Sequence, residues 1–152
     1  MPKLPDEPQS LSVYVMHEPR LRALADKLDR WPRVNGDATY DERIAHSPSD
    51  PASEATCKRL QEQLAQADVA VVLISEDARS DEWIQWEIET IRAATRRIGL
   101  VGLLLQPWHI RPAAMTDCGA IFVPFKRDMV ERAILWATTE RHDRDDFQLV
   151  DE

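Results

Sequence analysis

The segment Ala67–Glu89 reads ADVAVVLISEDARSDEWIQWEIE and carries most of the information about the fold class. Its apolar run, Val69–Ile74, has no polar alternation, which is typical of a central strand buried on both faces of a parallel sheet. A polar loop, Ser75–Asp81, follows, and the next helix places Trp83 and Glu87 four residues apart on one face. Because open α/β sheets bind ligands outside the carboxyl ends of their strands, we expect Glu87 to lie beside a ligand site.

Strand and helix patterns alternate along the rest of the chain. The expected strands are Leu11–Met16, Val69–Ser75, Gly99–Leu105 and Ala120–Phe125, and the expected helices are Pro19–Arg30, Asp50–Ala67, Asp81–Arg97 and Lys126–Thr139. One further strand is doubtful and falls near Arg33–Asn35 or Ala38–Tyr40. This alternation predicts a flavodoxin-like three-layer α/β sandwich. Its central parallel sheet would have about five strands, in the order 2-1-3-4-5.

The length of 152 residues corresponds to one ordinary domain. Residues 1–10 are expected to form a disordered lead-in, residues 11–139 the folded domain, and residues 140–152 a charged tail. The N-terminus lacks a basic region followed by an apolar one, so we expect no signal peptide. The weakly charged stretch Ile98–Trp108 is too short to cross a bilayer, which favours a cytoplasmic protein with no membrane partner.

Composition and missing motifs argue against several functions. A net charge of −8 disfavours nucleic-acid binding, which depends on the neutralisation of phosphates. The four glycines form neither a GxGxxG nor a GxxxxGK[ST] pattern, and the four histidines form no HxxxH pair. We therefore expect no bound cofactor and no metal site. Cys57 and Cys118 are expected to be buried thiols of a reducing compartment.

The segment Ser75–Glu89 resembles the strand–loop–helix block of TIR and TIR-like domains. In that family an apolar strand ending in serine precedes the pattern S-x-W-x-x-x-E, and Ser80–Glu87 reads SDEWIQWE, with one extra residue between Ser and Trp. The resemblance is closest to the bacterial TIR-like sensor proteins of Thoeris antiphage systems, in which a G-[LV]-V-G strand follows. Ile98–Gly102, IGLVG, fits that continuation. The similarity covers about residues 11–137, but the first strand lacks the serine-rich end typical of the wider family.

The resemblance implies that the chain cleaves the bond between nicotinamide and ribose in NAD+, with Glu87 as the catalytic carboxylate. The leaving nicotinamide is neutral and the transition state resembles an oxocarbenium ion, so a nearby carboxylate stabilises the developing charge. The product is ADP-ribose, a cyclic isomer or a conjugate, depending on the nucleophile. In Thoeris-like signalling the product would activate a separate effector protein. The resemblance also allows a homo-oligomer.

Three further residues are candidates for substrate binding, and each has a structural alternative. Trp83 would either stack on a substrate ring or pack in the core. His17 follows the first strand at the sheet edge expected to hold the site. Asp41 belongs to the long second loop, which flanks the pocket in TIR-like folds. Trp108, in the loop before the last strand, favours a lid or interface rather than catalysis.

Two other functions compete with NAD+ cleavage. The first is a non-enzymatic TIR-like interaction module, in which exposed loops and Trp86 or Trp108 mediate assembly. The second is a nucleoside deoxyribosyltransferase-like enzyme, which shares the sheet type and also uses a carboxylate. That enzyme class normally carries a clearer substrate motif on the first strand than Tyr14–His17 provides.

Overall fold

A computed structural model of the chain describes residues 11–28, 31–35, 43, 45–95, 97–139 and 147–148. The expected lead-in, the candidate strand Ala38–Tyr40 and most of the expected tail lie outside these residues. Among the helices of the described ranges, none is long and apolar enough to cross a membrane. Cys57 and Cys118 are free thiols, each half-buried.

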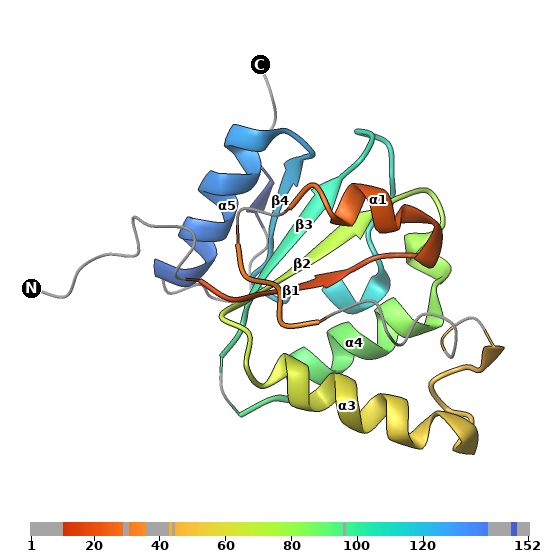
Figure 1. Ribbon diagram of the computed structural model, residues 1–152. Helices are drawn as coiled ribbons and strands as arrows, with labels where there is room; N and C mark the ends of the chain where they lie inside the picture. The colour runs from red at the N-terminus through yellow and green to blue at the C-terminus, as the bar shows by residue number, and fades with distance from the viewer. Residues whose placement is uncertain are drawn as a thin grey trace, which may run out of the picture.

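A five-stranded sheet forms the centre of the described structure (Figure 1). Its strands lie side by side in chain order, and each neighbouring pair is parallel. They are β1 (Val13–Met16), β2 (Val69–Ile74), β3 (Gly99–Leu104), β4 (Ile121–Pro124) and β5 (Phe147–Gln148). Every residue of β1, β2 and β3 is buried, as their uninterrupted apolar runs indicate. The prediction of an α/β fold with a central parallel sheet is therefore confirmed.

Helices connect the successive strands. They are α1 (Arg22–Ala25), α3 (Glu54–Leu64), α4 (Glu82–Ala93) and α5 (Arg127–Thr139), with short 3-10 helices at Pro19–Leu21, Pro51–Ser53, Ala78–Ser80 and Ala113–Met115. Asp50 caps the segment that leads into α3, because its carboxylate accepts the Ala52 N–H at 2.9 Å. The predicted first helix, Pro19–Arg30, is too long. The structure ends α1 at Ala25, and the chain then turns so that Trp31 packs into the core.

Each face of the sheet packs against its own pair of helices (Figure 1). Helices α1 and α5 cover one face, and α3 and α4 cover the other. Residues of β1 alternate between the two cores: Tyr14 and Met16 pack toward α3 and α4, whereas Val13 and Val15 pack toward α1 and α5. This is the flavodoxin-like three-layer sandwich that the alternation predicts, and it places Tyr14 on the same side of the sheet as α4.

Within the described residues, the outer edge of β1 holds a single bridge where the doubtful strand was expected. Val13 and Arg33 form one parallel bridge there. The Asn35 side chain takes the next position, because its amide donates to the Val15 carbonyl at 2.7 Å and its oxygen accepts the Val15 N–H at 2.9 Å. A side-chain amide thus replaces backbone pairing, and the bridge marks the edge position that the 2-1-3-4-5 order assigns to a second strand.

The far edge of the sheet is formed by β5, which lies within the expected C-terminal tail. Phe147 pairs with Ile121 and Gln148 with Phe122 of β4, in parallel register. A strand of two residues is too short for hydrophobic periodicity to reveal, so the sequence pattern did not predict it.

Candidate active site at Glu87

Glu87 occupies a core position on α4 although it is an acid. The helix begins after Asp81, whose carboxylate accepts the Ile84 N–H at 3.0 Å and caps the first turn. The buried face of the helix consists of Trp83, Ile84, Glu87, Ile88 and Ile91. The Glu87 side chain is fully buried. A carboxylate at such a position needs compensating partners, because an isolated buried charge is strongly unfavourable.

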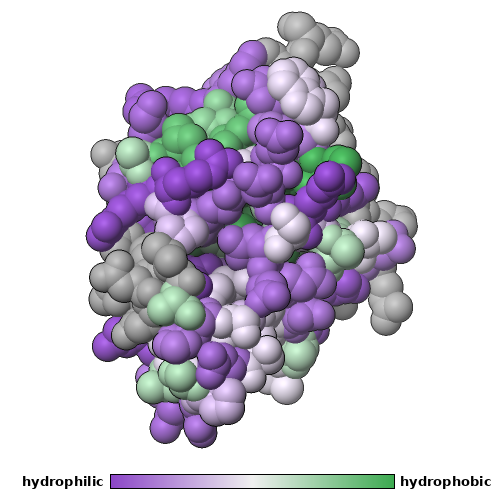
Figure 2. All heavy atoms as spheres, turned by 90° about the vertical axis from the view of Figure 1, so that its right-hand side faces the viewer, coloured by the Kyte–Doolittle hydropathy of each residue, from purple (hydrophilic) through white to green (hydrophobic). Residues whose placement is uncertain are grey.

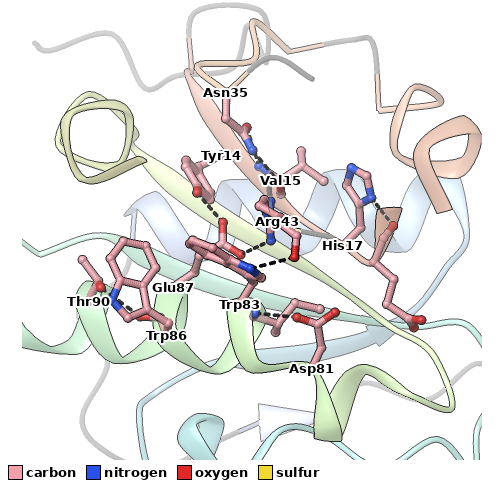
Figure 3. A network of polar contacts seen from close by, with 12 residues as sticks. Tyr14, Val15, His17, Asn35, Arg43, Asp81, Trp83, Trp86, Glu87 and Thr90 are labelled. Carbon is pink, nitrogen blue, oxygen red and sulfur yellow. Dashed lines mark hydrogen bonds and ion pairs between the residues drawn. The ribbon is translucent and has the colours of Figure 1, made fainter. Parts of the chain in front are cut away.

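Two residues supply those partners, as Figure 3 shows. The Tyr14 hydroxyl of β1 donates a hydrogen bond to Glu87 Oε2. Arg43 Nη2 donates to Glu87 Oε1 at 2.8 Å and forms an ion pair whose two side chains are 2% and 0% exposed. Each oxygen of the carboxylate is thus held by a different element, one by the central sheet and one by the segment before α3.

Trp83 holds the segment that carries Arg43. Its indole nitrogen donates to the Arg43 carbonyl at 3.0 Å and to the His46 carbonyl at 2.9 Å. The Arg43 guanidinium also lies over the indole, 5.5 Å from the ring centroid, within the range of a cation–π contact. Trp83 and Glu87 therefore contact the same residue. Trp83 holds the backbone of Arg43 and lies against its guanidinium, and Glu87 pairs with its charge.

Trp86 packs beside this cluster rather than in the open. Its ring meets that of Trp83 edge-on, with centroids 5.8 Å apart and an interplanar angle of 76°. Trp86 is half-buried against the core under α3 and α4. Trp83 thus contacts both Trp86 and Arg43.

The electrostatics of Glu87 reflect its burial. Burial raises the pKa of the Glu87 carboxyl above its ordinary value of 4.5, since the charged form loses its hydration. The positive charge of Arg43 and the hydrogen bond from Tyr14 act in the opposite direction and lower that pKa in part. A perturbed carboxyl with specific partners is a common feature of functional sites, although structural ion pairs show it as well.

His17 lies at the predicted edge of the sheet, but Figure 3 shows its ring apart from the Glu87 carboxylate. The ring is fully buried. Its Nδ1 lies 2.6 Å from the Glu18 carbonyl oxygen, which can only accept, so Nδ1 carries the proton. Its Nε2 lies 3.2 Å from Arg33 Nη2, which can only donate. Both ring nitrogens are therefore engaged in the neutral form of His17.

Asp41 lies outside the described residues, whereas Arg43, two positions later, belongs to the cluster. Sequence reasoning selected the loop but missed Arg43 and Tyr14. Tyr14 offered one signal, because a tyrosine in a fully buried strand needs a partner for its hydroxyl. No local spacing reveals Arg43, since it is 44 positions from Glu87.

A second acidic network lies at the carboxyl ends of β1 and β2. The Ser75 hydroxyl donates to Glu18 Oε1, and Arg20 Nε donates to Glu18 Oε2 at 3.0 Å. A crevice of about 480 Å³ adjoins this network; its lining includes Arg20, Ser75, Glu76, Gln106, His109 and Phe125 and does not include Glu87. Among the described residues, no group of three or more His, Cys, Asp or Glu side chains is placed to hold a metal ion.

The parallel sheet, its two helical layers and the acid-bearing helix after β2 define a TIR-like domain of flavodoxin-like architecture. A family model described as Thoeris protein ThsB, TIR-like domain, matches residues 17–107, which is more than half of the chain. The chain belongs to this family, which is associated with antiphage defence, and the resemblance noted in the sequence is confirmed. Neither the curated proteins nor the solved structures gave a match. The matched range includes Arg43 and Glu87 but not Tyr14.

Proposed function

We propose that the chain is an NAD+-cleaving enzyme that makes an ADP-ribose-type nucleotide signal, linear or cyclic, for antiphage defence. The observation that carries this proposal is the Glu87 carboxylate, fixed by Arg43 and Tyr14 on the helix that bears the family motif. The signal would act through a nucleotide-activated effector protein. NAD+ is the substrate, and the proposal needs no metal and no further cofactor.

The chemistry asks little of the protein beyond one well-placed carboxylate. As the bond between the nicotinamide nitrogen and the ribose C1′ breaks, its electron pair leaves with nicotinamide, which departs as a neutral molecule. Positive charge develops at C1′ and the ring oxygen, and Glu87 stabilises it. Water then adds to C1′ and releases a proton to give ADP-ribose, or a nitrogen of the adenine ring adds and gives a cyclic isomer.

Access to Glu87 requires the segment Arg43–His46 to move. Both carboxylate oxygens are engaged, and neither is exposed. Ribose hydroxyls would replace the Arg43 guanidinium at Oε1 once that segment withdraws, and the Trp83 ring would be uncovered to contact the substrate. His17 would contact substrate only after it releases Arg33.

This reading predicts slow turnover in the resting protein and faster turnover after activation. The rate depends on the fraction of Glu87 that is ionised, because only the ionised form stabilises a developing cation. Burial raises the pKa of the Glu87 carboxyl, and the Arg43 guanidinium lowers it. When Arg43 withdraws, the positive charge of the nicotinamide ring must take its place to keep Glu87 ionised.

The test is mass spectrometry of nucleotides after incubation of the protein with NAD+, with and without lysate from phage-infected cells. Glu87→Gln should lose nicotinamide release by at least about 100-fold, since one electrostatic group commonly contributes that much. Glu89→Gln is the matched control, because Glu89 is exposed on the same helix. Equal nicotinamide release from Glu87→Gln and the unaltered chain would exclude Glu87 from the chemistry.

The burial of Glu87 also favours a second candidate, the non-catalytic interaction module. A carboxylate enclosed by Tyr14 and Arg43 serves equally well to join β1, α4 and the Arg43 segment. On this alternative, no turnover appears under any activating condition, and Glu87→Gln changes only stability. Measurement of unfolding beside activity therefore separates the two functions.

A further inference from the structure

A hollow of about 330 Å³ lies on the face of the sheet that α1 and α5 cover. Its apolar wall consists of Leu28, Trp31, Phe125 and Val130, which pack in or against the core on that face. Its volume is within the range of roughly 300–1,000 Å³ typical of ligand pockets. Glu87 and its partner Tyr14 lie on the opposite side of the sheet, toward α3 and α4. The sheet therefore separates the hollow from the candidate active site.

Three charged side chains complete the lining of the hollow. Lys27 and Arg127 are exposed, and neither forms an ion pair with another residue that the structure describes. Glu131 is half-buried and lines the hollow as well, so two cations and one acid leave a net charge of +1. Asp26, the neighbour of Lys27, pairs with Arg33 at 3.5 Å instead. The lining therefore favours an anion.

The first turn of α5 adds backbone donors beside these cations. The Val130 N–H donates to the Lys126 carbonyl at 2.8 Å, so the N–H groups of residues 127–129 precede the helical ladder. Arg127 and Val130, at the two ends of this turn, both line the hollow, whereas the exposed Asp128 between them does not. The N-terminus of a helix attracts phosphate and other anions. An anion beside Arg127 would thus also face the positive end of α5.

A buried donor in the wall of the hollow lacks an acceptor. Trp31 is 5% exposed, and its indole Nε1 has no hydrogen-bond partner among the described residues. Trp83 is the contrasting case, because its indole N–H donates to two backbone carbonyls. Buried polar groups in native proteins nearly always have a partner, since they have lost their bonds with water. A ligand oxygen or ring nitrogen in the hollow would supply the acceptor that Trp31 lacks.

The neighbouring crevice at the carboxyl ends of the strands lacks this character, although Phe125 lines both. Its cation, Arg20, is already held by Glu18 at 3.0 Å and by Asp77 at 3.6 Å. Figure 2 shows the right-hand side of Figure 1, toward which the arrows of β2 and β3 point, and hydrophilic side chains border apolar patches there. Of the two depressions, the hollow is the one whose cations have no described acidic partner.

We infer that the hollow binds a nucleoside monophosphate. The base lies against the rings of Trp31 and Phe125, and such stacking accepts any base because every base has a π face. The phosphate lies between Lys27 and Arg127 at the start of α5. A phosphate carries more negative charge at neutral pH than a single carboxylate does, so it matches two cations and a helix N-terminus better. An acceptor on the base or the ribose takes the Trp31 N–H.

Equilibrium dialysis of the full chain against radiolabelled AMP, without NAD+, tests this site. AMP should bind with one site per chain. Adenosine lacks the phosphate and inorganic phosphate lacks the base, so each should bind at least about 10-fold more weakly than AMP. Absence of AMP binding would overturn the inference, and so would adenosine or inorganic phosphate that binds as tightly as AMP.

Two substitutions in the lining test the placement of the ligand. Arg127→Gln should weaken AMP binding by about 10-fold, since it removes a charge-assisted contact. Arg132→Gln is the matched control, because Arg132 is an exposed cation of α5 outside the lining, and it should leave AMP binding unchanged. Trp31→Phe keeps an aromatic ring but removes the indole N–H, and it should weaken binding by about 5-fold, with the fold verified by circular dichroism. Equal losses in Arg127→Gln and Arg132→Gln would exclude the phosphate position.

Glu87→Gln separates this site from the proposed reaction. The sheet lies between the two sites, so AMP should bind to Glu87→Gln as it binds to the unaltered chain. Loss of AMP binding in Glu87→Gln, with Arg127→Gln unaffected, would place the nucleotide at the candidate active site and overturn the inference. Because AMP has no nicotinamide to release, these results do not depend on whether the chain cleaves NAD+.

Discussion

The two acidic networks of the molecule contain the same chemical groups in different surroundings. Glu87 accepts from the Tyr14 hydroxyl and the Arg43 guanidinium, and Glu18 accepts from the Ser75 hydroxyl and the Arg20 guanidinium. The arginine side chain is 2% exposed in the first network and 58% exposed in the second.

The difference in exposure decides what each arginine contributes. Water screens the Arg20 pair and competes for it, so the pair adds little to stability. Arg43 and Glu87 have both left water, and each depends on the other to remain charged in the core. The comparison teaches that the inner network is a closed structural unit, which would have to open before Glu87 could act as the proposed function requires, whereas the outer network already faces a crevice.

The largest effect on this comparison is expected from Arg43→Ala. It leaves Glu87 buried without its counter-ion and should lower the free energy of unfolding by about 3–5 kcal/mol. Urea unfolding followed by circular dichroism measures the change. Arg43→Ala combined with Glu87→Gln should be less destabilising than the sum of the two single changes, because no uncompensated charge remains. Strict additivity would mean that the two side chains do not interact.

Tyr14→Phe should have the next largest effect. It removes the only hydroxyl that serves Glu87 Oε2 in Figure 3 and should cost about 1–3 kcal/mol of the free energy of unfolding. Ser75→Ala is the matched change in the outer network, and its cost should be smaller because the Arg20 side chain, which also holds Glu18, is 58% exposed to solvent. Equal costs in urea unfolding would show that burial does not separate the two networks.

Trp83→Phe should release the Arg43 segment while it preserves an aromatic ring in the core. The loss of two indole hydrogen bonds should cost about 1–2 kcal/mol, and hydrogen exchange at residues 43–46 should become faster. If the segment covers the active carboxylate, nicotinamide release from NAD+ should rise in the same variant. Trp86→Phe is the control, because Trp86 donates no such bond in the described contacts. Unchanged exchange at 43–46 would show that Trp83 does not hold the segment.

Arg20→Ala should change stability by less than about 1 kcal/mol, and added salt should reduce even that difference. The measurement is urea unfolding at low and high ionic strength. A loss as large as that of Arg43→Ala would remove the contrast between the two networks.

The smallest effect concerns pH. Because burial raises the pKa of folded Glu87, the folded chain holds this proton more tightly than the unfolded chain. The stability of the unaltered chain relative to Glu87→Gln should therefore be highest at acidic pH and fall as pH rises from the ordinary value of 4.5 through the raised pKa. Unfolding of both chains across this interval gives the difference. A relative stability that increases with pH would mean that Arg43 outweighs burial at the carboxyl.

Much of the fold was predictable because continuous apolar runs and helix caps are local signals. Val69–Ile74 and Gly99–Leu104 are strands as expected, and Asp81 caps the start of α4 as expected. The length of α1 was not predictable, since leucines at helical spacing continue past Ala25 while the backbone turns. The replacement of a strand by the Asn35 amide is a tertiary event that no periodicity encodes.

The candidate site was predictable only on the helix itself. Trp83 and Glu87 lie one turn apart, so their shared face follows from sequence spacing. Tyr14 and Arg43 reach Glu87 from 73 and 44 positions away, and only the packing of β1 and the Arg43 segment on α4 brings them there. The roles of Trp83, His17 and Asp41 toward substrate stay predictions.

The Asn35 side chain has a consequence for the behaviour of the chain in concentrated solution. The outward backbone groups of β1 are occupied: Val13 bonds to the Pro32 carbonyl and the Val34 N–H, and Val15 bonds at both its N–H and its carbonyl to Asn35. An unprotected strand edge is a template for pairing with strands of other molecules. This edge offers no such template, so the protein is shielded at β1 from the strand-to-strand growth that leads to fibrils.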